Sequence, residues 1–162
     1  MKNKKLVFSI IFIIVLIIID QFSKFIVLNN ERIEINKIIS IETCTNTGMA
    51  FGFNSGNIKN IFISILIIIL IINFMKKQSE LIDTKTNISL CLILGGALGN
   101  LIDRFLRGGI IDFIRIYNFP VFNLADVFIV LGWILVVIFV IIFSGKNNRG
   151  ETVEGKNKDI RN

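Results

Sequence analysis

Residues 6–19 read LVFSIIFIIVLIII, a run that is apolar apart from Ser9. A short polar patch, residues 20–24 (DQFSK), follows it, and the apolar character resumes through Leu28. The whole stretch is close to the ~20 residues that a helix needs to cross a hydrocarbon core of ~30 Å. It lacks strand alternation, and inside a bilayer only helices and closed barrels satisfy the backbone. The stretch therefore predicts a transmembrane helix.

Three further apolar runs of similar length occupy residues 58–75, 88–105 and 127–143. Hydrophobic residues make up 53% of the 162-residue chain, which is more than an ordinary soluble domain of this length needs for its core. Lipid therefore solvates much of the surface. The fold class that follows is a membrane all-α bundle of four transmembrane helices, in one domain over residues 1–144.

The basic residues predict how the bundle is oriented. Eleven of the eighteen Lys and Arg residues lie before the first run, between the second and third runs, or after the fourth. The positive-inside rule places these segments, and both termini, in the cytoplasm. The polar tail, residues 145–162, is expected to be disordered. The first run is not expected to be a cleaved signal peptide, because residues 20–24 stand where a small-residue cleavage site would be required.

The outer segment between the first two runs has a different periodicity. Ile33 and Ile35 alternate with polar residues, and so do Ile39 and Ile41. Alternation with a period of two is typical of half-buried strands. Residues 30–57 are therefore expected to form a small extracytoplasmic sheet that lies on the membrane surface.

Charge and composition exclude several functions. The net charge is +6, but the basic residues lie at the ends of apolar runs rather than in an aromatic-interleaved patch, so we expect no nucleic-acid partner. The chain has no histidine. Nucleophilic mechanisms that need a histidine base, and metal sites with histidine ligands, are therefore excluded.

The predicted topology brings distant polar segments to the outer membrane face. They are residues 20–24 (DQFSK), 46–52 (NTGMAFG), 99–104 (GNLIDR) and 122–126 (FNLAD). Ionisable residues at membrane depth are costly and by default mark a functional site. A small transporter would instead place them near the midplane, usually within inverted repeats. A non-catalytic scaffold would not need two unpaired acids in apolar surroundings.

Two pairs within these segments have helical spacing. Asp20 and Lys24 are four residues apart and can form an ion pair, which is either purely structural or orders the site. Asn100 and Arg104 share a helix face. Asp103 directly precedes Arg104 in the sequence. It is expected either to pair with a charged group near Arg104 or to cap the end of the helix.

Asp112 and Asp126 differ from the other acids. Asp112 has apolar neighbours on both sides, and Asp126 opens the fourth apolar run. Two carboxylates that meet in a low-dielectric site share one proton, which is the arrangement of aspartic proteases. Two alternatives stay open: Asp126 as a favourable helix N-terminal charge, and a Ca²⁺ or Mg²⁺ site built with Asn100 and Asn123.

The four polar segments and residues 110–113 (IIDF) resemble, in order and spacing, the motifs of bacterial lipoprotein signal peptidase, signal peptidase II. The resemblance covers roughly residues 6–143. It implies four transmembrane helices with a small extracytoplasmic β-cradle, and cleavage of prolipoprotein signal peptides immediately before a diacylglyceryl-modified cysteine. It implies a multi-pass enzyme of the bacterial cytoplasmic membrane, with its active site near the outer face.

The resemblance also implies roles for individual residues. The catalytic aspartates are Asp112 and Asp126, and the reaction needs no metal or other cofactor. The supporting or substrate-binding residues are Asp20, Lys24, Asn46, Gly48, Asn100, Arg104, Asn123 and Ala125. The partners are expected to be lipidated precursors and membrane lipids, and we expect a monomer.

Overall fold

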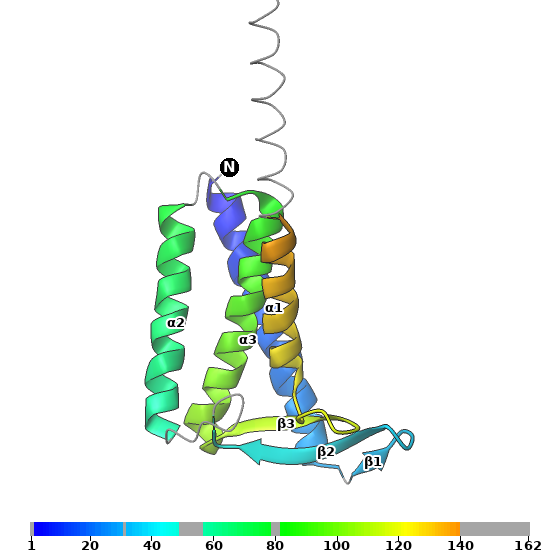
Figure 1. The fold of residues 1–162 in the computed structure, drawn as a ribbon. Helices are drawn as coiled ribbons and strands as arrows, with labels where there is room; N and C mark the ends of the chain where they lie inside the picture. The colour runs from blue at the N-terminus through cyan, green and yellow to red at the C-terminus, as the bar shows by residue number, and fades with distance from the viewer. Residues whose placement is uncertain (1, 31, 49–56, 79–81, 140–162) are drawn as a thin grey trace, which may run out of the picture.

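The computed structural model describes residues 2–30, 32–48, 57–78 and 82–139. The predicted tail, residues 145–162, and positions 49–52 of the second polar segment lie outside the described residues. The described chain forms four helices and one antiparallel sheet (Figure 1). The elements in chain order are α1 (Lys2–Leu28), β1 (Ile33–Glu34), β2 (Ile39–Asn46), α2 (Asn57–Lys77), α3 (Thr84–Arg107), β3 (Ile110–Ile116) and the fourth helix (Leu124–Phe139).

Three helices are long and apolar enough to cross a membrane, and the described part of the fourth is shorter. Their mean hydropathies are 2.6 for Lys4–Leu28, 2.4 for Ile58–Lys77 and 1.4 for Thr84–Arg107. The third of these, α3, is the least apolar but the most buried. Over an 18-residue stretch of each helix, 56% of the residues of α3 are buried in the protein, against 17% for α1 and 11% for α2. Because α3 is surrounded by protein while α1 and α2 expose isoleucine and phenylalanine, α3 is the centre of the bundle and lipid covers the rest.

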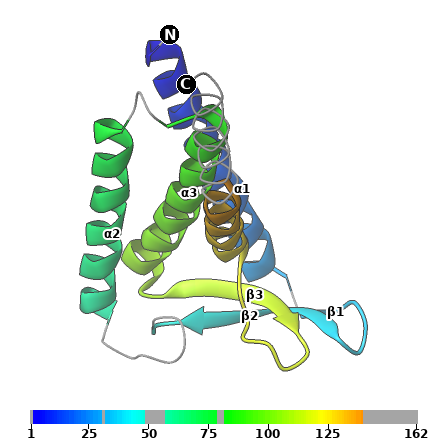
Figure 2. The ribbon, with the colours of Figure 1, turned by 45° about the horizontal axis from the view of Figure 1, so that its top comes forward.

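The sheet lies across one end of the bundle, opposite the N-terminus of α1 (Figures 1 and 2). Its order is β1-β2-β3, and both pairs are antiparallel. The expected strands after α1 are confirmed. The third strand, β3, lies between α3 and the fourth helix, where the sequence pattern predicts no strand. It pairs Ile39 with Ile116 and Cys44 with Asp112, with an irregularity in β2 between Ile41 and Cys44.

Glycines on α3 let its neighbours approach closely. A Cβ on Gly96 would lie 2.3 Å from the main-chain oxygen of Ala125, at the start of the fourth helix. One on Gly95 would lie 2.8 Å from the Leu16 side chain of α1. Small residues at such positions allow membrane helices to pack backbone against backbone. The helix ends at Gly108, whose φ of 73° is the left-handed conformation of a C-cap.

An ion cluster ties the helices to the sheet. Lys24, Asp20 and Asp103 are all completely buried. The Lys24 ammonium lies 2.8 Å from an Asp20 oxygen and 2.7 Å from an Asp103 oxygen, which joins α1 to α3. The pairing of Asp20 with Lys24 expected from their spacing is confirmed. Of the two roles expected for Asp103, the structure supports pairing near Arg104, because Asp103 interacts electrostatically with Arg104 and forms an ion pair with Arg107. Gly108 rather than Asp103 caps the helix.

The two carboxylates of the cluster also bind main-chain amides. Asp20 Oδ1 accepts a hydrogen bond of 3.0 Å from the N–H of Ala125. Asp103 Oδ2 accepts one of 3.2 Å from the N–H of Ile111 in β3. These amides belong to the residues immediately before Asp126 and Asp112. The cluster thus holds the backbone that carries both aspartates.

We predict that Lys24→Met strongly destabilises the protein. Removal of one member of a buried ion cluster leaves uncompensated charge and costs about 3–5 kcal/mol. Thermal unfolding in detergent measures the loss. Lys59→Met, at an exposed lysine near the start of α2, is the matched control and should change stability by less than about 0.5 kcal/mol. Equal melting temperatures for the two variants would contradict the structural role of the cluster.

We also predict that Gly96→Ala destabilises the contact between α3 and the fourth helix by about 1–3 kcal/mol, because the added methyl group meets main-chain rather than a flexible side chain. Gly108→Asn is the control, since nothing lies within 4 Å of a Cβ there and asparagine tolerates positive φ. The melting temperatures of the two variants test this. A Gly96→Ala protein as stable as the wild type would show that the helices are not in close contact.

Candidate active site

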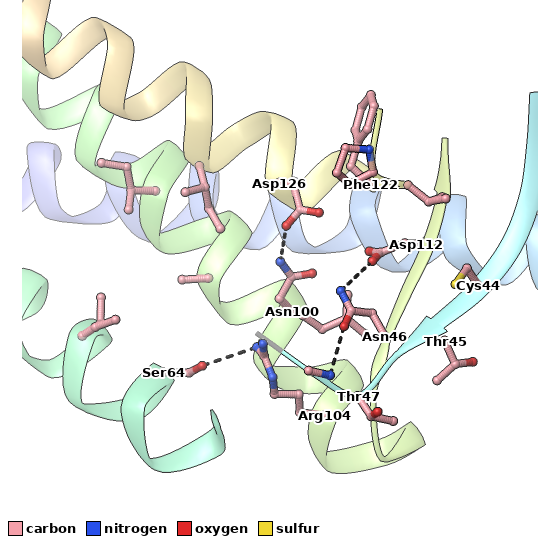
Figure 3. Close-up of a pocket in the computed structure, with 18 of the residues that line it drawn as sticks. Cys44, Thr45, Asn46, Thr47, Ser64, Asn100, Arg104, Asp112, Phe122 and Asp126 are labelled. Carbon is pink, nitrogen blue, oxygen red and sulfur yellow. Dashed lines mark hydrogen bonds between the residues drawn. The ribbon is translucent and has the colours of Figure 1, made fainter. Parts of the chain in front are cut away.

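Asp112 and Asp126 line one cavity of about 1000 Å³ at the sheet end of the bundle. Asp112 lies on β3 and is 3% exposed, whereas Asp126 lies in the first turn of the fourth helix. Figure 3 shows the two carboxylates near each other, with Asn100 of α3 and Asn46 of β2 beside them. The fold therefore brings together the two acids singled out from the sequence.

Asn123 contacts both aspartates. Its amide Nδ2 donates to Asp112 Oδ1 at 2.7 Å. Its main-chain N–H donates to Asp126 Oδ2 at 3.3 Å, and its Oδ1 accepts from the Asp126 N–H at 2.9 Å. The last two contacts form a reciprocal cap at the start of the fourth helix. One buried residue, through its side chain and its main-chain N–H, therefore sets the positions of the two carboxylates relative to each other.

Two further asparagines each hold one aspartate. Asn100 Nδ2 donates to Asp126 Oδ1 at 2.8 Å, while its oxygen accepts from Asn123 and, at 3.2 Å, from the Lys24 ammonium. Asn46 Nδ2 donates to Asp112 Oδ2 at 3.1 Å, and its oxygen accepts from the N–H of Gly48 at 3.0 Å. Asn100 thus links the dyad to the buried ion cluster, and Asn46 links it to the end of β2.

The environment raises the pKa of Asp112 to about 6 from the usual 3.8. Removal of the carboxylate from water is the largest cause, and the nearby charge of Asp126 acts in the same direction. Hydrogen bonds from Asn46 and Asn123 oppose the shift. A carboxyl with a pKa near 6 can hold a proton under conditions in which an exposed aspartate would have lost it.

The remaining predicted residues fall into two groups. Arg104 and Gly48 line the cavity, and Arg104 Nη1 donates to Ser64 Oγ of α2 at 3.4 Å. The second group does not line the cavity and consists of Asp20, Lys24 and Ala125. These residues support the site from behind the lining, through the ion pair of Asp20 with Lys24 and the hydrogen bond from the Ala125 amide to Asp20. Asn100 and Arg104, which helical spacing placed on one face of the helix, both line this cavity.

Sequence reasoning missed two kinds of residue. Asp103 was assigned no role at the site, although Asp103 and Arg107 are four residues apart, the spacing of a helical ion pair. The contact of Asp103 with the Ile111 amide forms only when β3 packs on α3. The apolar cavity wall was also missed, because its members look like ordinary membrane-spanning residues. They are Ile67 and Ile71 of α2, Ile93 of α3, and Ile129 and Trp133 of the fourth helix.

The geometry does not favour the Ca²⁺ or Mg²⁺ alternative. Hard cations need several oxygen ligands directed at one point. Here the amide nitrogens of Asn46, Asn100 and Asn123 are directed at the carboxylates, so these side chains act as donors. Among the residues described, no group of three or more acidic, cysteine or histidine side chains is placed to hold a metal ion.

The chain was compared with known proteins. The family model described as signal peptidase (SPase) II matches residues 12–142. A protein of Haemophilus ducreyi named lipoprotein signal peptidase is 39% identical over 131 residues, which cover 74% of this chain and 81% of the relative.

Two solved structures, each described as a bacterial membrane enzyme studied by the in meso method, have the same fold. One has a TM-score of 0.76 and 31% identity, covering 85% of this chain and 90% of the other. The second has a TM-score of 0.71 and 33% identity, covering 82% and 91%. With the family model, they show that the chain belongs to the signal peptidase II family of aspartic peptidases, multi-pass enzymes of bacterial membranes that have lipoprotein signal peptidase activity.

Proposed function

We propose that Asp112 and Asp126 are the catalytic dyad, and that the enzyme cleaves prolipoprotein signal peptides immediately before a diacylglyceryl-modified cysteine. One observation carries the assignment. The two carboxylates come from separate elements, share the buried Asn123 and line one cavity at the end of the bundle. No other acid of the described chain lines that cavity.

The pKa of Asp112 gives the two acids different roles. Two neighbouring carboxylates share one proton, and burial raises the pKa of Asp112 to about 6. Asp112 therefore holds the proton and donates a hydrogen bond to the scissile carbonyl oxygen. Asp126 takes a proton from a water as that water attacks the carbonyl carbon. Collapse of the tetrahedral intermediate breaks the C–N bond, and the leaving nitrogen receives a proton from the dyad.

The cavity wall fits a substrate that is itself embedded in lipid. The apolar wall of the cavity consists of isoleucine side chains from α2, α3 and the fourth helix, together with Trp133. An apolar signal peptide and the acyl chains of a lipidated cysteine bury hydrophobic surface there without the loss of polar contacts. Arg104 provides a cation beside the aspartates, suited to polar groups of the lipid-linked backbone. We infer that catalysis needs no metal or other cofactor.

The charge distribution supports an orientation with both termini in the cytoplasm. The start of α1, the end of α2 and the start of α3 lie at the end of the bundle opposite the sheet (Figure 1), and these helix ends carry Lys4, Lys76, Lys77 and Lys85. Cytoplasmic segments are enriched in lysine and arginine. The sheet and the dyad then face the outer side of the membrane, where a lipidated precursor presents its cysteine.

We predict that Asp112→Asn and Asp126→Asn each lower the cleavage rate by on the order of 10²–10⁴-fold, because an amide cannot exchange the proton. Cleavage of a purified diacylglyceryl precursor in detergent micelles measures the effect, with the unlipidated precursor expected to stay uncut. Asp83→Asn is the control, since Asp83 caps the start of α3 and asparagine caps equally well.

Near-normal turnover by either dyad variant would refute the assignment. The same assay tests the inference about metals, because the rate should not change with EDTA. Loss of activity on chelation, with recovery on added Mg²⁺ or Ca²⁺, would support the metal alternative instead.

We predict that the rate falls as the pH rises above about 6. The proton on Asp112 is present below its pKa of about 6 and is lost above it. The hydrogen bond from Asn46 lowers that pKa, so Asn46→Ala should move the alkaline limb to higher pH. Profiles of kcat against pH test the direction. Asn29→Ala, at an exposed position beyond α1, should leave the limb in place, and a shift to lower pH in Asn46→Ala would contradict the assignment.

A further inference from the structure

The free end of the sheet carries exposed apolar side chains that the catalytic site does not use. They belong to the β1–β2 hairpin and to the end of β3. We name this set the sheet-tip patch, and it consists of Ile33, Ile35, Ile38, Ile116 and Tyr117, with exposed fractions between 38% and 68%. None of the five lines the catalytic cavity. An exposed apolar patch of this kind marks a surface that contacts something outside the protein.

Hydrogen bonds place the five residues together. The Tyr117 N–H donates to the Ile38 carbonyl at 2.7 Å, which joins the end of β3 to the hairpin. Ile116 pairs with Ile39, the residue after Ile38. The Ile35 N–H donates to the Ile39 carbonyl at 3.1 Å. The patch residues therefore lie together at one end of the sheet.

Two members of the patch, Ile33 and Ile116, lie on the sheet face that looks toward the helices. Successive side chains of a strand alternate, so Ile116 shares a face of β3 with Asp112. Ile33 shares that face too, since it pairs with Ile41, which pairs with Ile114. Asp112 on this face hydrogen-bonds Asn123, at the start of the fourth helix. Where the sheet extends beyond the bundle, the same face is directed at the surrounding bilayer.

The hairpin does extend beyond the bundle. Both ribbon views show β1 and the adjoining end of β2 projecting sideways past α1 (Figures 1 and 2). The outer surface of α1 stays apolar up to its last turn, with Phe22 and Phe25 both 61% exposed and Leu28 46% exposed. Lipid therefore reaches the end of α1, and the projecting hairpin lies over that lipid. The patch continues the lipid-facing surface of the helix.

Tyr117 supports the same partner. Its φ of 44° lies in the left-handed region, which is unfavourable for a bulky side chain. Its side chain is 68% exposed, so packing within the described chain does not repay that strain. Tyrosine is enriched at membrane–water interfaces, where its ring contacts lipid and its hydroxyl stays hydrated. Two nearby basic residues, Arg32 and Arg115, pair with Glu34 and Glu42. Lys37 is exposed in the turn between β1 and β2, at a position suited to a lipid phosphate.

We propose that the sheet-tip patch is a membrane anchor that inserts into the interfacial region of the adjacent leaflet. The anchor acts on one end of β3, and Asp112 lies four residues away on the same strand. Contact with lipid therefore holds the catalytic strand at a constant depth relative to a bilayer-embedded substrate. The proposal concerns bulk phospholipid and does not depend on which residues carry out the cleavage.

Fluorescence of a single tryptophan tests the proposal in the full chain reconstituted into phosphatidylcholine vesicles. Trp133→Phe removes the one native tryptophan. In that background, Ile33→Trp reports on the patch, and Glu34→Trp, the next residue of β1 on the opposite face, is the matched control. With dibrominated phosphatidylcholine, we expect Ile33→Trp to lose most of its emission and to be blue-shifted, and Glu34→Trp to be quenched far less.

Three results would overturn the proposal. Red-shifted, unquenched emission at both positions would place the hairpin in water. Blue-shifted emission at position 33 that bromine does not quench, and that varies with the protein-to-lipid ratio, would show a second copy covering the patch. Equal strong quenching at positions 33 and 34 would show that the sheet has no lipid-facing side.

Tyr117→Asn separates anchoring from folding. Asparagine tolerates the left-handed conformation, so the melting temperature in detergent should stay the same or rise. Removal of the ring should weaken the anchor and reduce the bromine quenching of Ile33→Trp. Unchanged quenching with unchanged stability would show that Tyr117 is not part of the anchor and would contradict the proposal.

Discussion

The buried ammonium of Lys24 is the contact on which the site depends. It pairs with both Asp20 and Asp103, and Arg107 provides a second positive charge beside Asp103. Each of these carboxylates in turn accepts a hydrogen bond from the main-chain amide of a residue adjacent to a proposed catalytic aspartate. An isolated charge in a low dielectric is very costly, so the two buried carboxylates need the cations beside them. The cluster therefore joins two helices of the bundle to the strand and the helix start that carry the dyad.

The dyad itself is held by neutral donors. Three asparagines supply amide N–H groups to the two carboxylates, and the Asn100 oxygen also accepts from Lys24. Amides fix the positions of the aspartates without adding charge beside them, and burial raises the pKa of Asp112 although these hydrogen bonds oppose the shift. The cationic and anionic groups of the cluster lie behind this layer, outside the cavity lining. This separation allows one carboxyl to stay protonated a short distance from a buried lysine.

The sheet has two tasks at its two ends. At the bundle, β3 carries Asp112 and receives the contact from Asp103. At its free end, the same strand reaches Ile116 and Tyr117, where the anchor would contact lipid. An intramembrane peptidase must set its carboxylates at the depth of the bond that it cuts. A strand that contacts the protein at one end and lipid at the other can fix this depth, because both contacts act on the same rigid element.

Local sequence patterns determined the elements and much of the site. Long apolar runs can only be solvated by lipid, so their number and length predict the helices, and helical spacing alone predicts the contact between Asp20 and Lys24. The alternation after α1 predicted β1 and β2. The family resemblance, rather than spacing, supplied the roles of Asn46 and Asn123, because an isolated asparagine carries no periodic signal.

Tertiary structure alone decided which distant groups meet. The segment 110–116 is almost continuously apolar and lacks the alternation of a half-covered strand, and it becomes β3 only because β2 supplies its hydrogen-bonding partner. Asp103 could be read as a cap or a local ion pair until β3 packed against α3 and brought the Ile111 amide to it. The cavity wall and the sheet-tip patch were hidden for the same reason. Periodicity records which face of one element is apolar, whereas contact between elements depends on pairing that no single segment encodes.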